Sequence, residues 1–209
     1  TVDHFNSLKI KVDKFNIVGS INLSIAENFL SNKKNNSNMG VKPYVCVIAG
    51  AMPETSLSLD NHTLTQLYER QTKLWEYITK FSKKHKILFK LASRQTADFE
   101  NSDLKKKLRY DNENKIFRDI NSDNEYFIKV DRYRKNFTSY QIAFYSELVL
   151  GFHSTLLLES LAKRKKILCL SSLDSYSNTH LDPLMPEDSI SSMYKPSYDE
   201  FEDRVLSLL

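Results

Sequence analysis

The chain has 209 residues, only four of them glycine, and 41% of its residues are hydrophobic, which fits a globular chain with one full domain and part of another. The net charge of +4 is mild, with both signs interspersed. Such a charge favours anionic partners such as nucleotides, phospholipids or membrane surfaces only weakly, and we expect no nucleic-acid partner.

Two cysteines, Cys46 and Cys169, lie in apolar strand-like runs, which predicts buried thiols in a reducing compartment. No Cys/His cluster has the spacing of metal ligands. No apolar run approaches the about 20 residues that span a bilayer, and no signal peptide is visible at the start. We therefore expect a cytoplasmic protein that uses no metal and no cofactor other than its substrate.

The first forty residues differ from the remainder of the chain. We expect strands at residues 8–12 and 15–18 and a short helix at residues 25–30. Residues 31–40 are polar and have no hydrophobic period, as is typical of a linker. The sequence therefore predicts that residues 1–40 are the end of a preceding domain plus a linker, and that residues 41–209 form the main domain.

From residue 44 onward, apolar runs alternate with amphipathic segments. We expect buried strands at residues 44–49, 86–91, 125–130, 148–150 and 166–170, with a short last strand at 190–194. Between and after them we expect helices at residues 63–84, within 98–120, at 138–145, from 154 onward, and from 197 to the end. Capping boxes open three of these helices, at Thr63–Gln66, Thr138–Gln141 and Ser197–Glu200.

This alternation predicts an α/β fold, Rossmann-like, with a mostly parallel sheet and helices on both faces. Ligands of such folds bind beyond the carboxyl ends of the strands, near the point where the strand order reverses. The loops expected there are residues 50–54, 90–95, 131–138 and 151–155. Because three of these loops carry basic or hydroxyl side chains, we expect a site for an anion with several hydroxyls, such as a nucleotide.

The turn at Gly151 is the most informative of these loops. An apolar strand enters Gly151, a residue that tolerates unusual backbone angles and lets a ligand approach closely. Ser154 and Thr155 then open a helix, and the amides at a helix start suit a phosphate. Glu159 lies one turn further on, where it can accept hydrogen bonds from a sugar hydroxyl. The same pattern is also typical of an ordinary strand-to-helix turn with Ser or Thr as the N-cap.

A longer pattern surrounds this turn. Residues 140–168 read Y-x-x-A-x-x-S-E-L-V-L-G-F-x-S-T-x-x-x-E-x-L-A-x-x-K-K-I-L. The pattern resembles the C-terminal half of bacterial GT-B glycosyltransferases of the surface-carbohydrate and capsule type, including Kdo- and sialic-acid-transferase-like enzymes. It resembles UDP-N-acetylglucosamine 2-epimerases more distantly. The strand at residues 15–20 and the closing helix with Tyr198 and Phe201 extend the resemblance over residues 15–209.

The resemblance implies a transferase with two Rossmann-like domains, in which this chain holds the nucleotide of the sugar donor. The donor phosphate would be bound by Gly151, His153, Ser154, Thr155 and Arg94. Glu159 would contact the ribose or the donor sugar. The base would lie near a loop that contains Arg132, Tyr133 and Thr138.

His153 is the one candidate for a catalytic group in this chain. The catalytic base of the resembled enzymes comes from the N-terminal domain, so we expect the chain to be incomplete as an enzyme without such a domain. The implied partners are a nucleotide sugar and a glycan or lipid-linked acceptor. A location at the inner face of the membrane, with peripheral association, is part of the same expectation, as is a role in capsule or lipopolysaccharide biosynthesis.

Two other functions remain open from the sequence. The first is an epimerase-like or hydrolytic enzyme acting on a nucleotide sugar, for which Glu54, Asp131 and Asp174 are the acidic candidates. The second is a non-catalytic Rossmann-like interaction domain, which would hold no ligand at the Gly151 turn.

Overall fold

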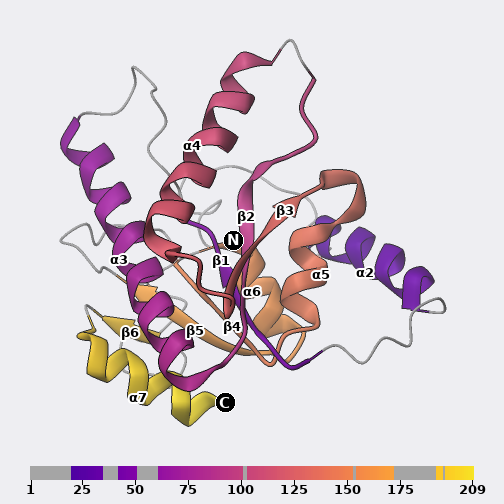
Figure 1. Cartoon of the computed structure of the whole chain (residues 1–209). Coiled ribbons are helices and arrows are strands. Elements are labelled where there is room, and N and C mark those ends of the chain that lie inside the picture. The colour runs from indigo at the N-terminus through magenta and orange to yellow at the C-terminus, as the bar shows by residue number, and fades with distance from the viewer. Residues whose placement is uncertain are drawn as a thin grey trace, which may run out of the picture.

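The computed structural model describes residues 20–34, 42–50, 61–100, 103–152, 154–171, 192–194 and 196–209. In these residues, six strands form a sheet in which every neighbouring pair is parallel (Figure 1). The strand order is β3-β2-β1-β4-β5-β6. The strands are β1 (Val45–Ile48), β2 (Phe89–Thr96), β3 (Phe127–Arg132), β4 (Leu148–Gly151), β5 (Lys166–Ser171) and β6 (Ser192–Tyr194). The expected α/β, Rossmann-like fold is confirmed.

Helices cover both faces of this sheet (Figure 1). One face packs against α3 (Asn61–His85), α4 (Leu104–Asn121) and α7 (Tyr198–Leu208), and the other against α5 (Thr138–Phe144) and α6 (Thr155–Ala162). Alternate residues of β1 serve the two layers, with Val45 and Val47 in the first and Cys46 and Ile48 in the second. This period of two explains why the strands read as unbroken apolar runs.

The α3 layer is the larger of the two cores. Trp75 is fully buried in it and meets the edge of the Phe117 ring at a centroid distance of 5.7 Å. The apolar stripe expected along residues 63–84 therefore forms core. Both cysteines are buried as thiols, and burial strongly raises the pKa of Cys46.

Helix α2 (Ile21–Lys34) lies against the α5 and α6 layer. Its Ala26 is fully buried, and Phe29 meets the Phe137 ring at a centroid distance of 5.3 Å. Glu27 forms an ion pair with Lys163 at the end of α6. The expectation of a linker from residue 31 is wrong for residues 31–34, because α2 continues to Lys34. The domain boundary itself stays a prediction.

Two expected strand ends are also wrong. Strand β2 continues to Thr96, although a loop was expected from residue 90, so Arg94 is a strand residue. The pairing of β2 with β3 shifts register between Ala92 and Thr96, a bulge that lets the strand continue with polar residues. Strand β3 extends two residues beyond the expected end, to Arg132.

The capping predictions have different outcomes. Ser197 and Glu200 form the expected reciprocal capping box at the start of α7. The box expected at Thr138 is wrong, because Phe137, in a left-handed conformation, is the N-cap of α5 and the Thr138 hydroxyl bonds the Tyr133 backbone instead. The side chains of the Thr63 box lie outside the described residues, as do the strands expected at residues 8–12 and 15–18. Among the helices that the structure describes, none has both the length and the apolar character to span a membrane.

Helix α7 is joined to α3 by a charged cluster that makes a pH-dependent contribution to stability. Lys84 Nζ and His85 Nε2 lie 2.9 and 2.5 Å from Glu202 Oε1. Hydrogen bonds from Lys84 and then His85 lower the pKa of Glu202 from 4.5 to about 2. Because the folded-state pKa is lowered, this contribution is complete above pH 4.5 and is lost as the pH falls toward 2.

Glu202→Gln should therefore lower the free energy of unfolding by about 1 kcal/mol at pH 7. The difference from the unmodified chain should shrink between pH 4.5 and pH 2, as measured by urea unfolding at several pH values. Glu76→Gln, at an exposed position of α3, is the matched control. A difference that stays constant from pH 7 to pH 3 would contradict the assignment.

Candidate functional site

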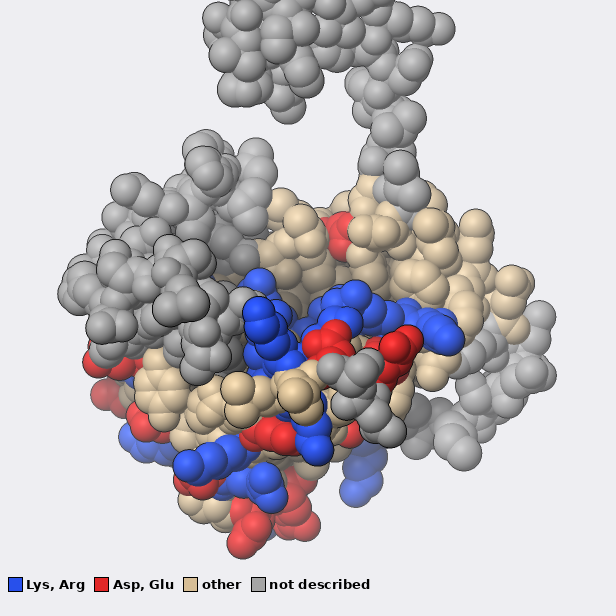
Figure 2. Space-filling view, turned by 90° about the horizontal axis from the view of Figure 1, so that it is seen from above, with Lys and Arg blue, Asp and Glu red and all other residues tan. Residues whose placement is uncertain are grey.

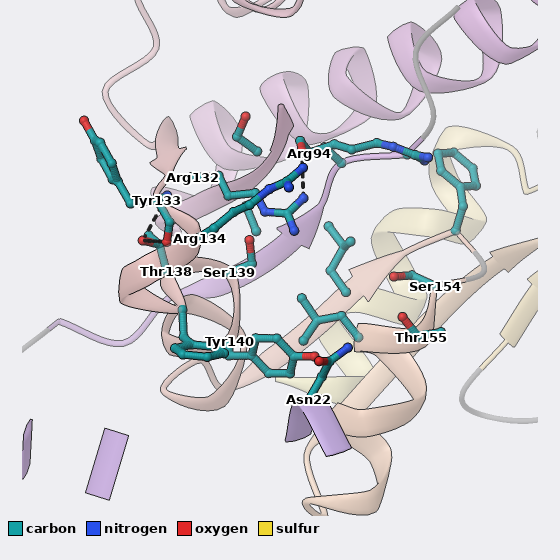
Figure 3. A pocket seen from close by; sticks show the side chains of 18 of the residues that line it. Asn22, Arg94, Arg132, Tyr133, Arg134, Thr138, Ser139, Tyr140, Ser154 and Thr155 are labelled. Atoms are coloured by element: carbon teal, nitrogen blue, oxygen red, sulfur yellow. Dashed lines mark hydrogen bonds between the residues drawn. The ribbon is translucent and has the colours of Figure 1, made fainter. Parts of the chain in front are cut away.

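A cavity of about 740 Å³ opens at the carboxyl edge of the sheet, where β1 lies between β2 and β4 (Figure 3). The strand order reverses at this point, since the chain leaves β1 toward β2 but later returns on its other side with β4. The ends of β1, β2 and β3, the start of α5, the β4–α6 turn and the start of α2 supply its walls. The polar lining residues are Asn22, Arg70, Ser93, Arg94, Arg132, Tyr133, Arg134, Thr138, Ser139, Tyr140, Ser154 and Thr155.

Arginines dominate one wall of this cavity. Arg94 comes from β2, Arg132 ends β3, and Arg134 follows in a short 3-10 turn, η1 (Arg134–Asn136). The Arg132 guanidinium donates to the Arg94 carbonyl oxygen at 2.8 Å, which fixes its direction (Figure 3). In a view onto the carboxyl edge of the sheet, Lys and Arg side chains cluster near the middle of the molecule (Figure 2).

The potential in this wall is positive. Burial lowers the pKa of Arg132, and the charges of Arg134 and then Arg94 lower it further, while Asp98 opposes them. Asp98 is not among the lining residues, and its carboxylate accepts the Arg134 backbone N–H. Among the described residues that line the cavity, none is Asp or Glu. An anion placed there would meet several guanidinium groups, and the nearby Asp98 carboxylate would offset their charge only in part.

A further guanidinium stands at the opposite end of this wall. Arg70 of α3 lies over the Phe152 ring, with its guanidinium carbon 3.8 Å from the ring centroid. Phe152 follows directly on β4 and is itself buried. This stacking holds a fourth cation beside the β4–α6 turn.

The β4–α6 turn brings its two hydroxyls to the cavity as expected. Ser154 is the N-cap of α6 and Thr155 is its first helical residue. The Ser154 side chain makes no capping hydrogen bond, so its hydroxyl is not needed by the helix and faces the cavity with Thr155 (Figure 3). His153, the residue between Phe152 and Ser154, lies outside the described residues.

Gly151 has a packing role in the sheet, and its expected role in phosphate access stays a prediction. It ends β4, pairs with Ile48 in register, and is not among the residues that line the cavity. A β-carbon at this position would lie 3.1 Å from the Ile48 carbonyl oxygen and 3.1 Å from its β-carbon. The glycine therefore permits close packing of β4 on β1, whereas the expectation was access for a phosphate.

Glu159 is also separated from the cavity. Its Oε1 accepts a hydrogen bond from the Ser20 hydroxyl, and Tyr140 of α5 stands between it and the ligand space. Burial and the neighbouring Glu159 carboxylate raise the pKa of Tyr140. The residues expected near the base do line the cavity, namely Arg132, Tyr133 and Thr138.

Six polar cavity residues were not among the predicted site residues: Asn22, Arg70, Ser93, Arg134, Ser139 and Tyr140. Arg134 lies inside a loop that was expected at the site, and Tyr140 belongs to the pattern that suggested the resemblance. Both could have been found by extending the site along those segments. Asn22 and Arg70 lie far from any expected loop, and only the packing of α2 and α3 brings them in.

Beneath the arginine wall, a buried charge network supports the polar end of β2. The Ser93 hydroxyl and the Gln95 N–H donate to the Glu113 carboxylate of α4, which is 1% exposed. Lys129 of β3 lies 3.5 Å from Glu113 and 3.2 Å from Asp131. These bonds satisfy the polar groups of Ser93 and Gln95 in the bulged segment of β2. They therefore hold Arg94, which lies between the two, at the cavity.

Lys129→Met should destabilise the fold by about 3 kcal/mol, because it leaves the Glu113 carboxylate buried without a cation. Urea unfolding measures the change. The double variant Glu113→Gln/Lys129→Met should recover most of the loss, since a neutral amide can still accept from Ser93. A single variant within about 0.5 kcal/mol of the unmodified chain would show that the pair is not a supporting element.

Comparisons with known proteins do not identify the family. No protein-family model matches the chain, and a search of curated proteins found no similar sequence. The function of the cavity must therefore be argued from its own geometry and charge.

Proposed function

We propose that the cavity binds a nucleotide sugar and that the chain is the donor-binding half of a glycosyltransferase for bacterial surface polysaccharides. The observation that carries the proposal is the arginine wall of Arg94, Arg132 and Arg134 at the point where the strand order reverses. Ser154 and Thr155 face the same space from the start of α6. Phosphates are bound well by such a combination of guanidinium groups, hydroxyls and helix amides.

The chemistry follows from where charge develops. When a sugar leaves its nucleotide, negative charge builds up on the departing phosphate. Donors and cations that are already in place stabilise this charge more than they stabilise the bound substrate. Arg132, fixed by its bond to the Arg94 carbonyl and partly desolvated, is the best placed of these groups.

The described part of the cavity supplies binding and charge stabilisation, but not a general base. None of its described lining residues is a carboxylate or an imidazole, and the raised pKa of Tyr140 keeps that hydroxyl protonated at neutral pH. Activation of an acceptor hydroxyl would thus fall to a group outside these residues.

Of the three acidic residues that an epimerase-like reading would use, Asp131 is the one that the structure describes. Asp131 is paired with Lys129 and is not among the lining residues of the cavity. Glu54 and Asp174, the other acidic candidates, lie outside the described residues. A glycan or lipid-linked acceptor, and peripheral contact with the inner face of a membrane, belong to the same proposal.

A nucleotide screen tests the proposal directly. Thermal unfolding should be measured with the mono- and diphosphates of uridine, guanosine, cytidine and adenosine. We expect at least one ligand to raise Tm by about 5 °C at a concentration well above its Kd. The shift should disappear in Arg132→Ala and in Ser154→Ala/Thr155→Ala, because each change removes groups that face the phosphates.

Arg118→Ala is the matched control, since Arg118 is an exposed arginine of α4 that does not line the cavity. It should leave the shift unchanged. If no nucleotide stabilises the chain, or if the shift survives in the Arg132 and Ser154/Thr155 variants, the proposed donor site is wrong.

A further inference from the structure

The end of the cavity away from the arginines is polar and uncharged. Tyr140 of α5 and Asn22 of α2 line it, and the Tyr140 side chain extends toward the start of α2 (Figure 3). The Tyr140 ring packs between Phe137 and Phe144, with centroid distances of 6.1 and 5.6 Å. This packing fixes where its hydroxyl is presented.

Behind Tyr140 lies a carboxylate with unused hydrogen-bonding capacity. Glu159 Oε1 accepts from the Ser20 hydroxyl, but Glu159 Oε2 is buried and has no hydrogen-bond partner in the part of the chain that the structure describes. A buried acceptor of this kind is costly unless another group donates to it. The Tyr140 hydroxyl is the neighbouring donor, and the Glu159 carboxylate contributes to its raised pKa.

We propose that Tyr140 and Asn22 recognise the hydroxyls of a sugar ring of the ligand, and that Glu159 acts on the ligand only by positioning Tyr140. This inference rests on the proposed function, because it takes the arginine wall as the phosphate end. A tyrosine hydroxyl directed at a carboxylate keeps its lone pairs for a ligand hydroxyl, while an asparagine amide both donates and accepts. The pair therefore suits a neutral ring bearing neighbouring hydroxyls.

The assignment also gives α2 a part in the site. Asn22 reaches the cavity because the start of α2 is held by the bond between Ser20 and Glu159. The Glu159 carboxylate thus positions Tyr140 of α5 directly and Asn22 of α2 through Ser20. Recognition of the ring therefore depends on a segment that the sequence assigned to the preceding domain and linker.

The test compares ligands that differ in the ribose 2′-hydroxyl or in the presence of a donor sugar. For the base that binds best in the nucleotide screen, Kd is measured for the nucleoside diphosphate, its 2′-deoxy form and a corresponding nucleotide sugar. The preference is the ratio of the Kd of the ligand that lacks the hydroxyls to the Kd of the ligand that bears them. Tyr140→Phe and Asn22→Ala should each lower this ratio about tenfold. A lower ratio for the diphosphate and its 2′-deoxy form would identify the ring as the ribose. A lower ratio for the nucleotide sugar and the diphosphate would identify it as the donor sugar. The Kd of inorganic pyrophosphate should not change.

Glu159 is tested by a double-mutant cycle. If it acts through Tyr140, Glu159→Gln should weaken the same preference, and adding it to Tyr140→Phe should cause no further loss. Additive losses would mean that Glu159 contacts the ligand itself and would overturn its positioning role. Tyr126→Phe is the matched control, because a neighbouring glutamate, Glu125, also raises the pKa of Tyr126, but Tyr126 does not line the cavity.

The two proposals fail in different ways. If the unmodified chain binds nucleotides but Tyr140→Phe keeps the full hydroxyl preference, the inference about the ring is wrong and the donor site stands. If the unmodified chain binds no nucleotide, the donor site is wrong and the inference falls with it.

Discussion

The reversal of strand order at β1 is the constraint on which the site depends. Strand β1 is hydrogen-bonded to β2 on one side and to β4 on the other, and the connections from these strands diverge to opposite faces. Such a divergence leaves room at the carboxyl edge, which is where the described residues enclose the cavity. The ends of strands and the starts of α2, α5 and α6 meet at this space, and α3 adds Arg70 from within its length. The close approach of Gly151 to Ile48 holds the two central strands together beneath it.

Much of this arrangement could be predicted from sequence, because parallel strands bring their carboxyl ends to one edge. Arg94, Arg132 and Ser154 lie far apart along the chain, yet each follows or ends an apolar run, and all three line the cavity. Alternation of buried strands and amphipathic helices was enough to place them there. The prediction needed no knowledge of side-chain contacts, only of where each strand would end.

The parts that sequence reasoning missed depend on tertiary packing. Strand β2 runs past its apolar stretch because Glu113 of α4, which is paired with Lys129, accepts hydrogen bonds from its polar end. Asn22 reaches the cavity through the docking of α2, which local patterns do not encode. Glu159 lies on the expected helix, but the interposed Tyr140 ring keeps it from the ligand space. In each case a distant partner overrides what the local residues suggest.

The arginine wall has a consequence for how the unliganded protein behaves. Three like charges held together by the backbone of β2, β3 and η1 repel one another, and the anion that we propose for this cavity would offset that repulsion. Phosphate or sulfate in a buffer would occupy the wall, stabilise the fold and mask weaker ligands. The arginines that would bind the ligand therefore lower the stability of the unliganded protein. A neutral substitution among them would raise the free energy of unfolding but abolish the proposed binding.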